Sequence, residues 1–135
     1  NGKFVIRVRD TNTSTTTNYI ASEGNLVEVS SYDYNTHVFD MLTYFDGSFI
    51  AQIDYNDNTS SYDSLKIYDD TTGNLLKTVD FTTGDTYNNY NINFYGDNKF
   101  YVVFWNGGDT NVDWRIIQYN GNTNTLKQTT HTRIV

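Results

Sequence analysis

The sequence contains neither cysteine nor proline. Without cysteine there can be no disulfide bonds, thiolate-bound metals or cysteine nucleophile, and the redox compartment of the protein stays open. No apolar run approaches the roughly 20 residues that a membrane-spanning helix needs. Lys and Arg total 9 against 16 Asp and Glu, which gives a formal net charge of −7. Because binding to phosphate groups needs clustered positive charge, we expect neither nucleic acid nor an anionic membrane surface as a partner.

The residues that are present favour a folded, strand-rich chain. Apolar residues make up 37% of the 135 positions, aromatic residues 16% and charged residues 19%, which is too rich in packing groups for disorder. The length allows one domain, or part of a larger one. Abundant Asn, Thr, Tyr and Asp suit short strands joined by polar turns. We therefore expect an all-β fold.

An internal repeat organises the chain. Residues 48–78 and 99–129 align without a gap at an offset of 51 residues. The matched pairs are Phe49 with Phe100, Tyr68 with Tyr119, and Leu75 with Leu126. The segments "KFVIRV" and "YIASEGNLVEV" near the start of the chain follow the same pattern with a shorter middle loop. The sequence therefore holds nearly three copies of one unit.

Each complete unit is expected to form four antiparallel strands. In the middle copy the predicted strands are residues 38–45, 48–55, 63–69 and 75–81. The opening unit lacks the first strand, so the prediction is three strands, then four, then four. The predicted units are a partial blade at 1–29 and full blades at 30–81 and 82–135.

The hydrophobic patterns indicate sheets that are covered on both faces. "FIAQI" and "FYVVFW" are nearly continuous apolar runs, typical of a strand buried on both sides. Four-stranded sheets repeated about every 50 residues can cover both faces by stacking on one another. The fold expected on this basis is a segment of about two and three-quarter blades of a β-propeller. A β-solenoid and a pair of β-sandwiches are the alternatives.

The repeat also resembles known propeller repeats. A strand followed by Gly107-Gly108, a variable loop, Tyr119 and a fourth strand with Leu126 is similar to the kelch repeat. "YDDTTGNLLKT" equally resembles propeller repeats with a YD-x-x-TG-x-L pattern. Both resemblances imply a β-propeller.

The chain opens on a turn without the strand that should precede it. Asn1-Gly2 stands where Asp46-Gly47 stands in the next unit, between the first and second strands. Since a closed propeller needs about four blades or more, other material must complete the ring. The expected partners are the remainder of a larger propeller chain, copies of the same chain, or a protein that donates the missing strand.

The second-to-third-strand segments, residues 9–18, 54–63 and 105–114, are predicted to be loops that form the binding face. Asp54, Asn56 and Asn58 have the D-x-N-x-N spacing with which a calcium loop begins, so Ca²⁺ is the candidate cofactor. The rest of that motif is missing, because Thr59 and Leu65 replace its glycine and its glutamate. A solvated loop is the alternative interpretation.

Aromatic and acidic residues of these loops form a second candidate site. Rings stack on the apolar faces of sugars while carboxylates and amides bind the hydroxyls. Trp105 is expected to pack between blades. The candidate ligand-binding residues are Trp114, Tyr55, Tyr62, Asp109 and Asp113.

No catalytic motif is present, and the sequence favours a non-catalytic protein. The expected function is a scaffold or recognition module that binds protein or glycan in a secreted, cell-surface or virion-surface assembly, and hence an extracellular location. One alternative is a glycan-active hydrolase that uses a pair of carboxylates, and another is an intracellular adaptor of the kelch type. The candidates for such a pair are Asp54, Asp57, Asp109 and Asp113.

Overall fold

The chain is all-β in the computed structural model, which describes residues 3–33, 35, 37–43, 48–81, 86–107 and 111–134. These residues form eleven strands and no helix. The strands are β1 (Phe4–Asp10), β2 (Thr15–Ser22), β3 (Asn25–Asp33), β4 (His37–Thr43), β5 (Phe49–Asn56), β6 (Ser61–Asp69), β7 (Leu75–Asp80), β8 (Asn89–Phe94), β9 (Lys99–Gly107), β10 (Asn111–Asn120) and β11 (Thr125–Ile134).

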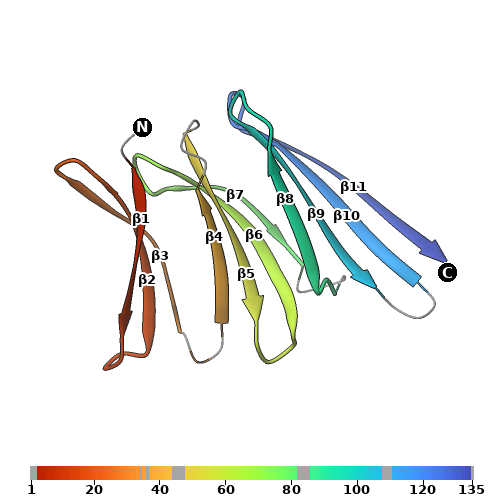
Figure 1. Cartoon of the computed structure of the whole chain (residues 1–135), viewed down its shortest axis with the longest axis horizontal. Helices are drawn as coiled ribbons and strands as arrows, with labels where there is room; N and C mark the ends of the chain where they lie inside the picture. Colours follow the sequence, from red (N-terminus) through yellow and green to blue (C-terminus); the bar gives the residue numbers. More distant parts are fainter. Residues whose placement is uncertain are drawn as a thin grey trace.

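The strands make three separate antiparallel sheets, in which neighbours in the chain pair with each other. Sheet A has the order β1-β2-β3, sheet B the order β4-β5-β6-β7 and sheet C the order β8-β9-β10-β11. The predicted grouping of three, four and four antiparallel strands is confirmed. β3 continues to Asp33, beyond the predicted end of the first unit at residue 29. The three sheets follow one another across the molecule, with sheet B between the other two (Figure 1).

Two of the predicted loops are mostly strand. β1 and β2 stay paired up to Asp10 and Thr15, and β5 and β6 stay paired up to Asn56 and Ser61. The polar stretches 9–18 and 54–63 therefore contain only a tight turn each. The prediction of loops is wrong here because Thr, Ser and Asn, which are common in loops, also pair well along a solvated strand end.

One turn design recurs at these hairpins and explains the Asn- and Thr-rich composition. The first residue of the turn is Asp or Asn, and its side-chain oxygen accepts the N–H of the residue two positions on. This bond joins Asp10 to Asn12, Asn56 to Asn58, Asp69 to Thr71 and Asn120 to Asn122, at 2.8 to 3.0 Å. The fifth residue has a positive φ in each case: Ser14, Ser60, Gly73 and Asn124. Side-chain oxygens of Asp and Asn are well suited to this local bond.

Strand pairing places one row of residues in corresponding positions in all three sheets. The rows, read across the second, third and fourth strands, are Phe4–Ala21–Leu26, Ile50–Tyr68–Leu75 and Phe100–Tyr119–Leu126. The third and fourth strands keep the predicted 51-residue offset. In the second strand, however, Phe100 corresponds to Ile50 and not to Phe49, so that predicted match is wrong. A β-bulge between Asp54 and Tyr55 changes the register of β5 against β6, while β9 and β10 pair without one.

The rows show that successive sheets are stacked in the same sense. Phe100 and Tyr119 of sheet C face sheet B, since their rings lie 5.6 and 5.0 Å from the ring of Phe49. Tyr68 of sheet B faces sheet A, since its hydroxyl bonds with that of Tyr32 on β3. Sheets B and C thus turn the same face toward the sheet that precedes each of them in the chain.

The main core lies between sheets B and C. It is one cluster of buried apolar residues: Phe49, Ala51, Ile53, Leu65, Ile67, Val79, Phe81, Tyr87, Phe100, Val102, Phe104, Ile117 and Tyr119. Phe104 is central to its aromatic part, with the rings of Phe81, Tyr62 and Tyr87 within 4.7 to 6.1 Å. Burial of these side chains is the largest favourable contribution to folding that the chain shows.

Candidate functional site

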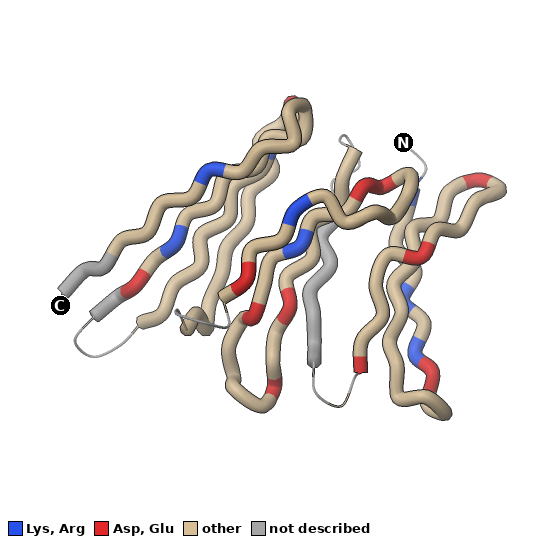
Figure 2. The backbone as a smooth tube through the Cα atoms, turned by 180° about the vertical axis from the view of Figure 1, so that it is seen from behind, with Lys and Arg blue, Asp and Glu red and all other residues tan. Residues whose placement is uncertain are grey.

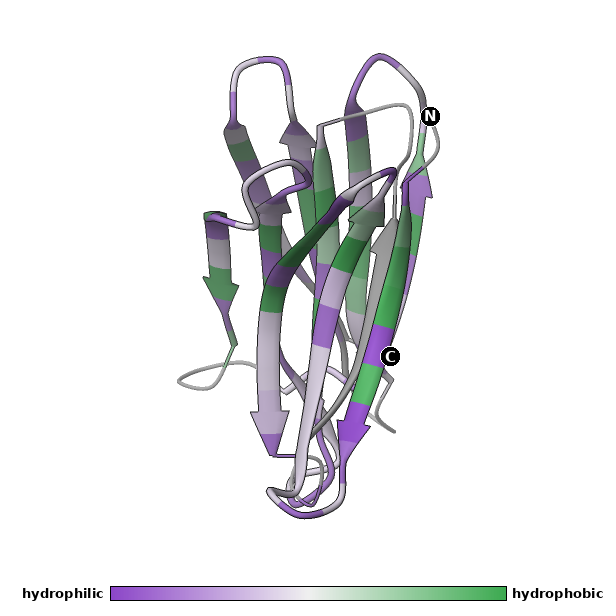
Figure 3. Cartoon of the chain, turned by 90° about the vertical axis from the view of Figure 1, so that its left-hand side faces the viewer, coloured by the Kyte–Doolittle hydropathy of each residue, from purple (hydrophilic) through white to green (hydrophobic). Residues whose placement is uncertain are grey.

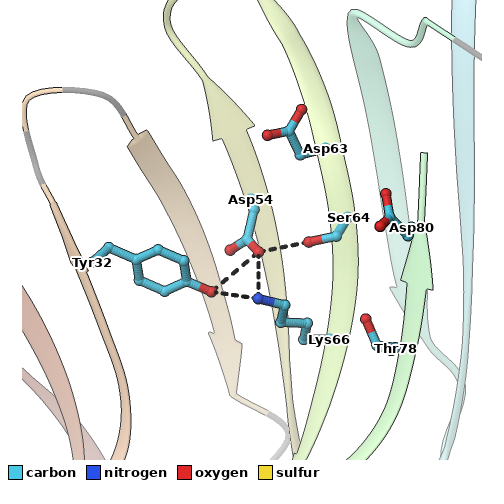
Figure 4. Close-up of a pocket in the computed structure, with 7 residues that line it drawn as sticks. All are labelled: Tyr32, Asp54, Asp63, Ser64, Lys66, Thr78 and Asp80. Carbon is cyan, nitrogen blue, oxygen red and sulfur yellow. Dashed lines mark hydrogen bonds and ion pairs between the residues drawn. The ribbon is translucent and has the colours of Figure 1, made fainter. Parts of the chain in front are cut away.

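The candidate site is a polar cavity of about 210 Å³ at the junction of sheets A and B. It is lined by Tyr32, Asp54, Asp63, Ser64, Lys66, Thr78 and Asp80. Tyr32 reaches across from β3, while the other side chains come from β5, β6 and β7 (Figure 4). The site therefore exists only because two sheets meet.

Strand alternation places the polar groups of sheet B on one face. Gln52 and Asp54 are two residues apart on β5, so both point toward sheet A. Lys66 pairs with Gln52, and Ser64 pairs with Asp54, on the adjacent strand. The alternate residues of β5, such as Ile53, point into the apolar core. One strand thus serves two interfaces of opposite character.

Asp54 is the centre of a hydrogen-bond network. Its side chain is buried, and its carboxylate accepts hydrogen bonds from Ser64 Oγ at 2.6 Å, from Tyr32 Oη at 3.1 Å and from Gln52 Nε2 at 2.8 Å. The ammonium group of Lys66 lies 3.4 Å from Oδ2. A buried carboxylate is tolerated only when it is paired and hydrogen-bonded. Asp54 meets both conditions.

Tyr32 connects the two sheets through its hydroxyl. The hydroxyl donates to Asp54 and accepts from Gln52 Nε2 and from Lys66 Nζ, the latter at 3.1 Å. The Lys66 ammonium also lies 5.3 Å from the centre of the Tyr32 ring. Burial, together with the nearby Asp54 carboxylate, raises the pKa of Tyr32 well above its usual value. Burial also raises the pKa of Tyr68, with a further contribution from Tyr32. Both phenols therefore remain protonated and act as hydrogen-bond donors.

The polar contacts continue from the cavity along sheet A. Gln52 Oε1 accepts a 2.7 Å bond from Ser30 Oγ, and Ser30 in turn accepts one from Asn18 Nδ2 at 3.3 Å. Arg7 Nε donates to Asn18 Oδ1 at 3.4 Å. Asn18 and Gln52 are both fully buried, at 0% exposure. Because an unsatisfied buried amide is costly, these bonds define how sheet A docks on sheet B.

The carboxylates of the cavity differ in the groups that they contact. Asp54 is held by Lys66 and three hydrogen-bond donors, so its carboxylate is already committed to the protein. The cavity also has Asp63 and Asp80 in its lining, and Asp63 Oδ2 accepts a hydrogen bond from Asn56 Nδ2 at 3.1 Å. Within the described part of the chain, no three His, Cys, Asp or Glu residues are grouped to hold a metal ion.

The three predicted calcium ligands do not share one environment. Asp54 is buried against sheet A. Asn56 forms the β5–β6 turn with its side-chain oxygen and donates from Nδ2 to Asp63 Oδ2 at 3.1 Å. Asn58 is exposed within that turn. The D-x-N-x-N spacing is thus also accounted for by a strand end followed by the recurring turn, and calcium binding stays a prediction.

The predicted sugar-binding residues lie at two places. Tyr55 and Tyr62 are register partners with ring centres 5.1 Å apart. Tyr62 also contacts Tyr90 and Phe104 of sheet C, at 5.2 and 6.1 Å, and lines a second cavity of about 330 Å³ with Asn56 and Asp63. This pair therefore lies at the edge of the B–C interface.

Trp114 lies elsewhere, on the face of sheet C that points away from sheet B. It pairs with Trp105 on β9 and with His131 on β11, whose ring is 5.2 Å away. The two tryptophans share one face, although the sequence suggested different places for them. The buried indole N–H of Trp114 has no acceptor within the described part of the chain. Asp113, the next residue on the strand, points to the opposite face. Asp109 lies outside the described residues.

Four residues of the site were not predicted from the sequence: Tyr32, Gln52, Ser64 and Lys66. A signal was present in "FIAQID", where Gln52 and Asp54 interrupt an otherwise apolar run at alternate positions. Polar residues with this spacing in a strand buried on both faces indicate a polar interface on one side. Tyr32 gave no comparable signal, because it comes from another sheet.

Comparison with known proteins identifies no relative. No family model matches the chain, and no match was found among curated proteins or solved structures. No described helix is long and apolar enough to cross a membrane.

Proposed function

We propose that the chain supplies blades of a β-propeller and acts as a non-catalytic scaffold or recognition module that binds protein or glycan. The observation that carries this proposal is the same-sense stacking of sheets A, B and C, with one row of residues repeated in each sheet. Such stacking of four-stranded meanders is how propeller blades cover one another. The resemblance to kelch and YD-x-x-TG-x-L repeats points the same way.

A binding role agrees better with the candidate site than the hydrolase alternative does. Glycoside hydrolysis needs two carboxyl groups that flank one bond in a shared cleft. Of the predicted carboxylates, Asp54 points toward sheet A and is paired with Lys66. Asp113 lies on β10 of sheet C and points toward the interface between sheets B and C, so these two carboxylates do not face one cleft. A surface-exposed or secreted assembly is the setting we propose, in keeping with the polar Asn- and Thr-rich turns.

The arrangement of the sheets is tested by an experimental structure of the assembled protein. We expect four-stranded sheets placed radially around an axis. Each sheet should turn the row that corresponds to Phe100–Tyr119–Leu126 toward the preceding sheet. Sheets that stack in a straight line, as in a solenoid, would contradict the propeller.

The absence of catalysis needs its own test. The intact chain is incubated with a panel of polymeric and oligomeric glycans, and release of reducing ends is measured alongside binding to a glycan and peptide array. We expect binding without turnover. Turnover that is abolished by the variants Asp54→Asn, Asp57→Asn, Asp109→Asn or Asp113→Asn, with circular dichroism unchanged, would overturn the scaffold role.

A further inference from the structure

The outer face of sheet A is an apolar surface that none of the described sheets covers. Strand alternation and register place Phe4, Ile6 and Val8 of β1 on this face, together with Tyr19 of β2 and Leu26 of β3. Phe4 is 53% exposed, Val8 47% and Leu26 59%. Figure 3 views this end of the molecule and shows apolar and polar positions alternating along the strands of sheet A. Exposed apolar groups concentrated on one sheet face mark an interaction surface.

The other two sheets show what kind of partner this face takes. Phe4, Ala21 and Leu26 correspond by register to Phe100, Tyr119 and Leu126 on sheet C. We call the face of a sheet that points away from the preceding sheet its far face. On sheet C the row is covered by the far face of sheet B, and Phe100 is 0% exposed. In the matching row on sheet A, Phe4 and Leu26 are exposed and Ala21 between them is buried. The complementary surface is therefore the far face of a sheet of the same repeat.

The far face of sheet C is the one other end surface of the described stack. Its residues include Tyr101, Val103, Trp105, Trp114 and Ile116, which are half-buried or exposed. A cavity of about 280 Å³, lined by Lys99 and Lys127 among others, opens at the turn end of this sheet. That end matches the end of sheet A where Phe4 and Leu26 are exposed.

The charges of the two faces are complementary. The strands of sheet A place Asp10, Glu28 and Asp33 on the outer face, by register, and no Lys or Arg among the described side chains. The strands of sheet C place Lys99 and Lys127 on the far face and no Asp or Glu among the described side chains, and Lys99 is ion-paired with Asp97 of the adjacent turn at 3.0 Å. The tube of Figure 2 shows how thinly charged positions are spread over the three sheets. At the ends that meet in this stacking, the charged groups are Glu28 of sheet A and Lys127 of sheet C, and their opposite charges favour the contact.

We propose that the far face of sheet C of one copy packs on the outer face of sheet A of a second copy, head to tail. The contact repeats the stacking seen between sheets B and C. Two copies contribute six sheets, within the range of about four to eight blades that propellers use, whereas three copies would exceed it. A dimer closed by two such contacts is therefore the expected assembly. The contact follows from the stacking alone, while closure of the ring rests on the proposed function.

Mass measurement by sedimentation equilibrium gives the first test. We expect twice the 15.6 kDa mass of the chain. Phe4→Glu should weaken self-association by at least about tenfold, because a carboxylate is buried in the contact: the corresponding residues Ile50 and Phe100 are 2% and 0% exposed inside the stack. Leu75→Glu is the matched control: Leu75 is 51% exposed, against 53% for Phe4, but lies inside the stack rather than at its end. A monomeric wild-type chain, or equal weakening by both variants, would overturn the proposal.

Cross-linking distinguishes head-to-tail packing from packing of two identical faces. Because the chain has no cysteine, single thiols can be introduced without background. Phe4→Cys and Lys99→Cys occupy the positions that correspond to Phe100 and Phe49, whose rings are 5.6 Å apart. With a short bis-maleimide, a mixture of the two variants should give a covalent dimer, and each variant alone should not. Dimers of the Phe4→Cys variant alone would show an A-to-A contact and overturn the proposal.

A complementation experiment separates the contact from the closed ring. Phe4→Glu blocks one surface and Trp114→Asp the other, so each variant alone should be monomeric and their mixture should form a dimer through the one intact pair of surfaces. Failure of the mixture to associate, with both variants folded, would overturn the contact. A wild-type chain that forms longer open ladders would retain the contact and instead overturn the closed propeller.

Discussion

Sheet B has two interfaces that differ in chemistry although the same strands build both. Toward sheet C it presents Phe49, Ala51 and Ile53, which are buried among aromatic rings. Toward sheet A it presents Gln52 and Asp54, which are equally buried but bonded to Ser30, Tyr32 and Lys66. Apolar contacts tolerate small shifts, whereas hydrogen bonds require defined positions. The B–C contact therefore contributes most of the stability, and the A–B contact fixes the orientation of the sheets.

Phe104→Ala should have the largest effect of the substitutions that distinguish the two interfaces. The side chain is 0% exposed and touches rings from both sheets, including Phe81 at 4.7 Å. We expect a loss of about 3–5 kcal/mol in the free energy of unfolding. Urea denaturation monitored by tyrosine fluorescence measures it. A loss below that of the polar variants described next would reverse the assignment of roles.

Lys66→Met should have the next largest effect, because it leaves the buried Asp54 carboxylate without its cation. We expect a loss of about 2–3 kcal/mol, below the usual range for buried pairs because the Lys66 side chain is 29% exposed. The double variant Asp54→Asn with Lys66→Met removes both charges and keeps an acceptor for Ser64, so it should be more stable than Lys66→Met alone. Simple additivity in this double-mutant cycle would argue against the ion pair.

Gly73→Ala tests how closely the two sheets approach. Gly73 has a φ of +75°, and a Cβ there would lie 2.5 Å from the backbone oxygen of Glu28 on sheet A. We expect a loss of about 2 kcal/mol, combining left-handed strain with the clash. Gly24→Ala is the control, because its φ is +70° and nothing lies within 4 Å of the added carbon. The control should lose about 1 kcal/mol of stability. Thermal denaturation measures both variants, and equal losses would show that the close approach of the two sheets at Gly73 does not affect stability.

Tyr32→Phe should have the smallest effect at neutral pH, about 1–1.5 kcal/mol from lost hydrogen bonds. The pH dependence is more informative. Since the pKa of Tyr32 is raised in the folded protein, the folded state holds its proton more tightly than the unfolded state does. The stabilisation is complete below about pH 10 and falls as the pH rises above it. Denaturation between pH 9 and 11 should show a steeper fall for the wild-type chain than for Tyr32→Phe. Parallel curves would contradict this.

Much of the fold was predictable because strand periodicity and the repeat are local signals. The grouping of strands followed from turns such as "DTTGN" and from apolar runs such as "FYVVFW". The register was not predictable, because a single bulge after Asp54 moves Tyr68 and Phe49 to opposite faces of sheet B. Of the candidate site, only Asp54 was among the predicted site residues. It was predicted as a calcium ligand, and its place as a buried hydrogen-bond acceptor was not predicted.

The sequence by itself determined the strand content, the turn chemistry and the threefold repetition, since each depends on residues close together in the chain. The tertiary structure alone decided which face of each sheet meets which neighbour. It brought Tyr32 from β3 to Asp54 on β5 and left Phe4, Val8 and Leu26 at an open end of the stack. The physical reason is that a one-residue change of register reverses every side chain on a strand. The character of each interface therefore depends on pairings that no short segment contains.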